Sequence, residues 1–397
     1  MLMLPLVTCA ALLASVSAQD SALQLGLLSG YEGVKRRLEN YAEKLSLEER
    51  YKDIDLKYLT QRLDHFTPSV TDTWKQLYAE NFEHYGGNNL IFLMIGGESS
   101  ISTDWLRRSF MSKQAEKFKA ATFTTEHRFY GKSIPRDLSI ESLRYLSSEQ
   151  ALADLAHFIT QMNIKHGFKN PKWIVFGGSY AGSLAAWLRY RYPHLVYAAV
   201  ASSGPLLAKV DFHEYFETVS KSLSSLGSHK CEEAVRAANK IMSEGVLKRN
   251  KASTLPRSFR TMAMQHDDKD NYTVVALRLD PRKRMSTPQS LTFDTSFVER
   301  SVNETNLNYG GYNLPVTRVA FVHGMNDPWS PLGIMKKAPK GSVAITIKGV
   351  AHCADMMPDQ DTDSQPLKNA RARISRMLER WIKAKTSEDE ELSLADF

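Results

Sequence analysis

Cysteine is scarce in this chain: only 3 occur among 397 residues, at Cys9, Cys231 and Cys353. So few cysteines exclude a small domain that depends on a disulfide framework, and whether Cys231 and Cys353 pair stays open. After residue 18, no apolar run approaches the roughly 20 residues that a membrane-spanning helix needs. The sequence also lacks a His-Glu-x-x-His motif and a phosphate-binding loop, so we expect neither a metal nor another cofactor.

The chain has a net charge of +7, and 24% of its residues are charged. No nucleic-acid-binding module accompanies the basic cluster at 282–284, so we interpret these charges as solvated surface and expect no nucleic-acid partner. A hydrophobic fraction of 43% is enough to build a large core. No internal repeat is evident.

The first 18 residues are typical of a signal peptide. They are apolar and end in Val16-Ser17-Ala18, the small-x-small pattern of a cleavage site. We therefore expect a secreted or lysosomal protein without a membrane span, in which residues 19–55 form an N-terminal extension. Two glycosylation sequons, at Asn271 and Asn303, fit that route. The oligomeric state stays open, with a homodimer among the alternatives.

From residue 56 onward, short apolar runs alternate with helical segments, which predicts an α/β fold with a mostly parallel sheet. Strands are expected at 90–95, 121–125, 173–176, 197–201, 319–322 and 343–347. Helices are expected from an N-cap at Ser148 to about Lys165, from Ala181 to Tyr192, and from Leu367 to Ala384. Residues 209–308 become helical and then polar, and we interpret them as a cap insertion between two core segments, 56–208 and 309–397.

The run Gly177-Gly178-Ser179-Tyr180-Ala181-Gly182 lies between a predicted strand and a predicted helix. A nucleophilic serine needs such a tight turn, with small residues two positions before and after it. Ala181 stands where glycine is more usual, but it is still small. We expect Ser179 to be the nucleophile, with the N–H groups of Tyr180 and of the Gly97 segment forming an oxyanion hole.

A serine of this kind requires a histidine base and an orienting acid, and in α/β-hydrolases the chain order is serine, acid, histidine. Asp327 follows the strand predicted at 319–322, and His352 follows the strand at 343–347. We therefore expect Ser179, Asp327 and His352 to form a catalytic triad. The rival base is His323, and the rival acids are Asp355 and Asp361, although each of these would break the chain order.

Several blocks together resemble the family of prolylcarboxypeptidase, dipeptidyl peptidase II and thymus-specific serine protease, and the last most of all. The blocks lie at residues 61–66, 96–98, 126–131, 145–154, 177–182, 327–329 and 351–356. The resemblance implies an α/β-hydrolase fold, the triad above, and an exopeptidase, often proline-directed, that acts on peptide substrates. It also implies that Trp329 lines the pocket for the residue before the scissile bond. Residues 126–128 are expected to form a mutually satisfied buried network.

The chain departs from the family in its cap, because residues 253–300 are shorter than usual and lack the expected Trp- and Cys-containing block. Substrate specificity, and activity itself, therefore stay open at this point. Two alternatives remain: an esterase or lipase-like hydrolase, and a catalytically impaired, truncated relative.

Overall fold

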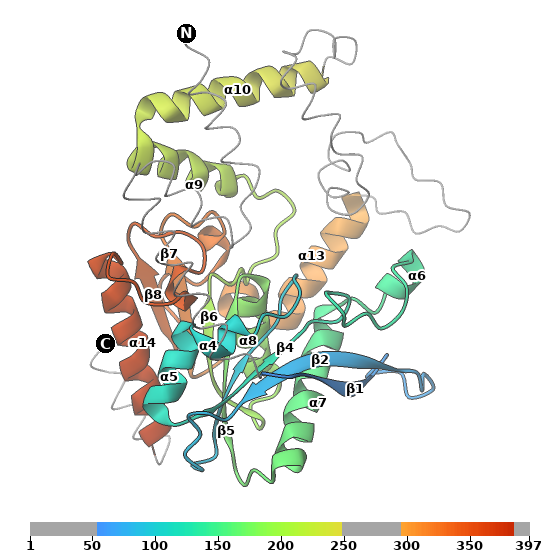
Figure 1. The fold of residues 1–397 in the computed structure, drawn as a ribbon. Coiled ribbons are helices and arrows are strands. Elements are labelled where there is room, and N and C mark those ends of the chain that lie inside the picture. Colours follow the sequence, from blue (N-terminus) through green and yellow to red (C-terminus); the bar gives the residue numbers. More distant parts are fainter. Residues whose placement is uncertain (1–53, 248–294, 385–397) are drawn as a thin grey trace. The chain divides into compact units, whose positions relative to one another are not determined.

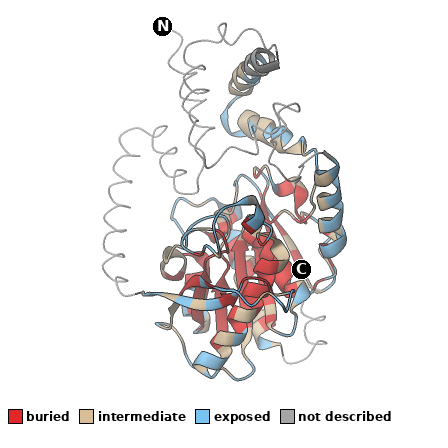
Figure 2. Cartoon of the chain, turned by 90° about the vertical axis from the view of Figure 1, so that its right-hand side faces the viewer, coloured by how far each residue is buried: buried red, intermediate tan, exposed pale blue. Residues whose placement is uncertain are grey.

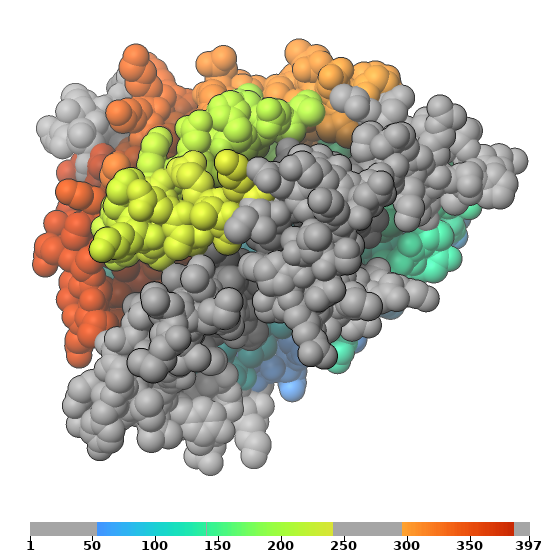
Figure 3. Space-filling model, turned by 90° about the horizontal axis from the view of Figure 1, so that it is seen from above, coloured from blue at the N-terminus to red at the C-terminus, as the bar shows by residue number. Residues whose placement is uncertain are grey.

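The computed structural model describes residues 54–247 and 295–384, and the rest of the chain is drawn in grey (Figure 1; Figure 3). The predicted signal peptide, nearly all of the predicted extension and Asn271 lie outside the described residues. The described residues divide between two compact units, one of 54–219 and 302–384 and one of 220–247 and 295–301. The domain boundaries drawn from the sequence stay a prediction.

The larger unit is built on one sheet of eight strands in the order β1-β2-β4-β3-β5-β6-β7-β8. The strands are β1 (Leu56–Arg62), β2 (Thr73–Asn81), β3 (Leu90–Met94), β4 (Ala121–Thr125), β5 (Lys172–Gly178), β6 (Val196–Ser202), β7 (Val319–Gly324) and β8 (Val343–Ile347). β2 pairs antiparallel with both β1 and β4, and all other neighbours are parallel. This order and these directions confirm the predicted α/β-hydrolase fold.

Both faces of the sheet are covered by helices, as Figure 1 shows. One face packs against α7 (Ser148–His166) and α8 (Tyr180–Arg191), and the other against α5 (Phe110–Phe118) and α14 (Gln365–Lys383). In β3, Ile91 and Leu93 face the first pair, whereas Phe92 and Met94 face the second. A strand buried on both faces needs no polar alternation, which is why these runs are continuously apolar. Figure 2 shows the buried residues, in red, concentrated along the sheet.

Two short helices, α4 (Asp104–Arg107) and α6 (Ile140–Leu143), lie in the connections around β4. Helix α7 begins one residue earlier than predicted, because Ser147 rather than Ser148 is the N-cap and its hydroxyl accepts a hydrogen bond from Gln150 N. It ends at Gly167, which takes the left-handed conformation, with φ 65°, that closes many helices.

The chain between β6 and β7 contains several helices within the described residues. It contains α9 (Glu214–Ser222), a π-helical turn (Leu223–Gly227), α10 (His229–Leu247) and α13 (Thr295–Tyr309). Ser220 on α9 donates a hydrogen bond to Glu232 on α10 at 2.6 Å and accepts one from Arg236 on α10 at 2.7 Å, and so connects the two helices. Within the described ranges, no helix has the length and apolar character needed to cross a membrane.

Candidate active site

Ser179 lies on a sharp turn between β5 and α8. Its φ of 59° and ψ of −131° are unusual for a residue with a side chain, and its backbone N donates a hydrogen bond to Ser202 O at 3.0 Å. A Cβ on Gly177 would lie 2.0 Å from the carbonyl oxygen of Ala181, so only glycine fits there. The strained turn thus depends on the small residues that the sequence provides.

Asp327 and His352 are brought together by the loops that follow β7 and β8. The Asp327 side chain is fully buried, and its Oδ2 lies 2.9 Å from His352 Nδ1. Its Oδ1 accepts a hydrogen bond from the backbone N of Trp329 at 3.0 Å. Because the carboxylate can only accept, Nδ1 of His352 carries the proton, and Nε2 is left to act as a base.

The environment of His352 acts on its pKa in two directions. Burial disfavours the charged imidazolium, but the hydrogen bonds of the ring with Asp327 and with the Cys353 thiol outweigh that effect, so the pKa of His352 is raised. About a third of the side chain is exposed, at 34%. The same contacts stabilise the imidazolium that would form when Nε2 takes up a proton.

The loop that carries His352 packs against the turn that carries Ser179. A Cβ on Gly178 would lie 2.9 Å from Cys353 Sγ and 2.7 Å from Met356 Sδ. Gly178 precedes Ser179, and Cys353 follows His352. The three residues expected to form the triad therefore follow β5, β7 and β8 in one sheet, and the Ser179 turn adjoins the loop that carries His352.

Of the two expected oxyanion donors, Tyr180 lies at the N-terminus of α8 and Gly97 lies on the loop that passes it. Tyr180 is the first residue of that helix, where backbone N–H groups have no partner within the helix. Gly97 follows β3, and a Cβ placed on it would lie 3.6 Å from Ala181 Cβ and 3.8 Å from Ala181 N. The segment after β3 thus runs directly past the start of α8, where developing negative charge would be stabilised.

Residues 126–128 are buried as expected, and His127 Nδ1 lies 2.7 Å from the backbone carbonyl oxygen of Arg128. Arg128 pairs with both carboxylate oxygens of Asp154, at 2.6 and 2.8 Å. His127 Nε2 lies 3.3 Å from the hydroxyl of Tyr180. The Glu126 carboxylate accepts backbone hydrogen bonds from Ile101 and Lys132, each at 2.9 Å. The expected network is therefore only partly mutual: His127 bonds to Arg128, whereas other residues satisfy the Glu126 and Arg128 side chains.

Trp329, two residues after Asp327, is one wall of an aromatic cluster. Its ring centroid lies 5.8 Å from that of Phe212 and 5.4 Å from that of Tyr215, and 38% of the residue is exposed. Burial and the charge of Asp327 raise the pKa of Tyr215. Sequence reasoning missed Phe212 and Tyr215, because an aromatic pair in a helical segment has the same pattern as core packing.

The rival residues have other surroundings. His323 is buried, and neither of its ring nitrogens has a hydrogen-bond partner within the described part of the chain. Asp355 is also buried, but its Oδ1 contacts the Ser202 hydroxyl. Asp361 is exposed. The carboxylate that contacts His352 is that of Asp327.

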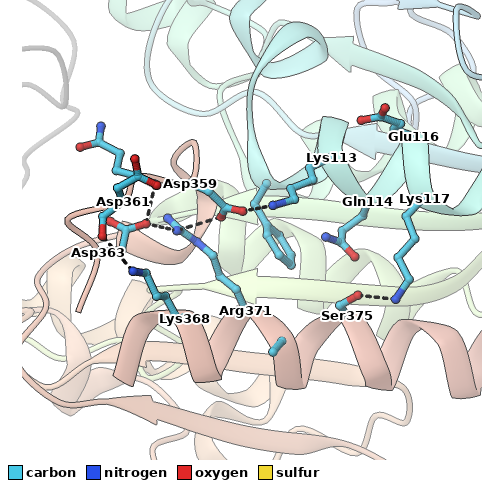
Figure 4. Close-up of a pocket in the computed structure, with 13 residues that line it drawn as sticks. Lys113, Gln114, Glu116, Lys117, Asp359, Asp361, Asp363, Lys368, Arg371 and Ser375 are labelled. Carbon is cyan, nitrogen blue, oxygen red and sulfur yellow. Dashed lines mark hydrogen bonds and ion pairs between the residues drawn. The ribbon is translucent and has the colours of Figure 1, made fainter. Parts of the chain in front are cut away.

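A charged groove of about 800 Å³ lies elsewhere on the unit, between α5, the loop before α14 and α14 itself (Figure 4). Its ionic side chains are largely paired: Arg371 contacts Asp359 and Asp363, and Lys113 contacts Asp359. The groove is remote in the sequence from Ser179. Arg371 connects it to the loop that follows His352.

Comparison with known proteins identifies relatives along most of the chain. The family described as serine carboxypeptidase S28 matches residues 61–276 and 290–374. A putative serine protease of Caenorhabditis elegans, K12H4.7, is 30% identical over 82% of this chain and 88% of its own length. The thymus-specific serine protease of Mus musculus is 29% identical over 82% of this chain and 87% of its own length.

A second putative serine protease of Caenorhabditis elegans, F56F10.1, is more similar over a shorter region. It is 44% identical over 54% of this chain, and the match spans only 40% of its own length. The family match and the relative that is covered almost end to end agree with the resemblance seen in the sequence. The chain belongs to the serine carboxypeptidase S28 family of serine-type peptidases.

Proposed function

We propose that this chain is a secreted or lysosomal serine exopeptidase that uses Ser179 as nucleophile, His352 as base and Asp327 as the orienting acid. The observation that supports it most is the 2.9 Å contact between His352 Nδ1 and buried Asp327, on a loop that packs against the Ser179 turn. An orienting acid, a base and a strained serine turn in one place are what acyl transfer from an amide requires.

In the proposed reaction, Ser179 Oγ attacks the scissile carbonyl carbon while His352 Nε2 takes the hydroxyl proton. The carbonyl oxygen becomes an oxyanion, which the N–H groups of Tyr180 and Gly97 stabilise. His352 then gives its proton to the leaving amine, the C–N bond breaks, and an acyl-enzyme remains. Water attacks this ester by the reverse sequence, with its proton passing to His352, and releases the acid product and free Ser179.

The aromatic cluster of Trp329, Phe212 and Tyr215 supports an apolar residue, such as proline, next to the scissile bond. The rings offer flat apolar surface beside Asp327, where the acyl part of a substrate can pack. The description of the family as serine carboxypeptidases supports cleavage near a chain end. Carboxypeptidase and dipeptidyl peptidase action remain the two forms of this proposal.

Export and glycosylation belong to the same proposal. Asn303 lies exposed on α13, where a glycan would point into solvent, whereas Asn271 lies outside the described residues. Expression in a secreting eukaryotic cell should yield protein in the medium that loses mass on treatment with an N-glycosidase. Protein retained unglycosylated in the cytosol would refute export.

A fluorophosphonate probe tests the nucleophile directly, because it phosphonylates only an activated serine. Wild-type protein should be labelled, and Ser179→Ala should not. Labelling that survives Ser179→Ala would refute the assignment, and a folded wild type without labelling would favour the impaired relative. Peptides with free or blocked termini, and simple esters, would then separate the two exopeptidase forms from an esterase.

A further inference from the structure

Two consecutive serines at the end of β6 lie between the Ser179 turn and the loop that carries His352. Ser202 and Ser203 are both buried, at 0% and 1% exposure. The backbone of Ser202 holds the turn: its carbonyl oxygen accepts the hydrogen bond from Ser179 N at 3.0 Å. Gly182, in the first turn of α8, packs so closely that a Cβ there would lie 2.6 Å from the same oxygen.

The side chains of Ser202 and Ser203 contact the loop that carries His352. Ser203 Oγ accepts a hydrogen bond from Cys353 N at 2.9 Å. Ser202 Oγ contacts Asp355 Oδ1. Cys353 and Asp355 lie one and three residues after His352, so one dipeptide holds both halves of the proposed catalytic machinery.

The backbone conformation of Ser203 indicates that its hydroxyl group has a specific structural role. Its φ of 50° lies in the left-handed region, which costs a residue with a side chain on the order of 1 kcal/mol and which glycine adopts without that cost. The backbone N of Ser203 is bound to Val322 O at 2.7 Å, so the position is fixed by β7. A serine in a place that suits glycine points to a role for the hydroxyl group.

The same loop is anchored from its other side by Arg371. This buried guanidinium donates hydrogen bonds to three backbone carbonyls of the loop, those of Ala354, Asp355 and Met357, at 2.8, 3.0 and 3.0 Å. Its remaining contacts are to Asp359 and Asp363, as Figure 4 shows. The loop after His352 is thus held by Arg371 through its backbone carbonyls and by the two serine hydroxyls on the side of the Ser179 turn.

We propose that Ser203, assisted by Ser202, is a positioning residue that sets the distance between His352 Nε2 and Ser179 Oγ. This inference rests on the proposed function. Proton transfer requires the two atoms within about 2.6–3.2 Å, and a displacement of about 1 Å lowers catalytic rates on the order of 100-fold. Loss of the Ser203 hydroxyl releases Cys353 N, the backbone group next to His352, and lets the base move away from the nucleophile.

The test compares Ser203→Gly and Ser203→Ala with Ser342→Ala as a matched control. Glycine keeps the left-handed backbone and removes only the side chain. Ser342 Oγ also accepts from a backbone N, that of Val319 at 3.1 Å, and donates to Val316 O at 3.0 Å, but it lies on the loop before β8. Ser342→Ala therefore also removes a hydroxyl that accepts a hydrogen bond from a backbone N, but at a place away from His352.

Both Ser203 variants should lower kcat and the rate of fluorophosphonate labelling by about 10- to 100-fold, with KM nearly unchanged, whereas Ser342→Ala keeps the wild-type kcat. Ser202→Ala should lower kcat less than the Ser203 variants do. Ser202→Thr, which retains the hydroxyl group, should have the kcat of the wild type. Rates are expressed per folded molecule, as determined from thermal melting.

The outcomes separate this inference from the proposal on which it rests. If Ser203→Gly is labelled at the wild-type rate while Ser179→Ala is not labelled, the positioning role is wrong and the triad stands. If Ser179→Ala is still labelled, both are wrong. An equal loss of kcat in Ser203→Gly and Ser342→Ala would also overturn the inference, because it would reflect general destabilisation.

Discussion

Asp355 should make the folded protein more stable at acidic pH than at neutral pH, and Asp355→Asn should remove that dependence. The carboxyl group is buried, and its Oδ2 has no hydrogen-bond partner within the described residues. Burial raises the pKa of Asp355 from 3.8 to about 6, although the Ser202 hydroxyl and the charges of Arg371 and His352 act in the opposite direction.

The direction of the pH dependence follows because the pKa of Asp355 is higher in the folded state than in the unfolded state. Below the unfolded pKa both states are protonated, and the stabilisation is fully present; it is lost as the pH rises through the folded pKa, where the buried group must ionise. A difference of about two pKa units corresponds to about 3 kcal/mol. Most of the change should occur between about pH 4 and pH 6.

The assay is urea unfolding of the wild type and Asp355→Asn across this range. The unfolding free energy of the wild type minus that of the variant should fall by about 3 kcal/mol from about pH 3.5 to pH 7. Asp361→Asn, an exposed carboxylate in the same loop, serves as the control and should show no such trend. A difference that stays flat, or that increases with pH, would refute the reasoning.

Three further predictions concern single substitutions. Burial lowers the pKa of His323 to about 4, so the unfolding free energy of the wild type minus that of His323→Leu should fall by about 3 kcal/mol as the pH falls from about 6.5 to below 4; a difference that does not change with pH would contradict this. Gly177→Ala should destabilise by about 3 kcal/mol and abolish probe labelling, because its Cβ would lie 2.0 Å from Ala181 O; a wild-type melting temperature would show that the turn relaxes. Trp329→Ala should raise KM for a peptide with proline before the scissile bond by about 10-fold and alter kcat less, and an unchanged KM would remove Trp329 from the substrate pocket.

The central strands could be predicted because burial on both faces leaves a continuous apolar run. β4 and β8 occur at the predicted residues, and β3, β5, β6 and β7 differ by a few residues at their ends. β1 and β2 were not predicted as strands. In β1 exposed and half-buried positions alternate, and β2 contains polar residues such as Gln76 that are buried by hydrogen bonds rather than by apolar packing. No hydrophobic pattern reveals such a strand.

The candidate triad could be proposed from the sequence because the topology of the fold determines which strand ends lie at the same edge of the sheet. In a parallel sheet, the carboxyl ends of β5, β7 and β8 lie along one edge, so residues that follow these strands converge whatever their separation in the chain. That rule places Ser179, Asp327 and His352 near one another without any knowledge of side chains.

The Ser202–Ser203 anchor could not be found in the same way, and the reason is physical. Its contacts join residues about 150 positions apart and depend on two local features: the left-handed φ of Ser203 and the course of the loop after His352. Neither leaves a periodic or compositional signal, since Ser203-Gly204-Pro205 has the composition of an ordinary turn. Topology brings the catalytic groups to the same edge to within several ångströms, whereas proton transfer needs them within a fraction of one. Ser202 and Ser203 act through hydrogen bonds to the loop after His352, and such contacts are found only from the packed structure of the two loops.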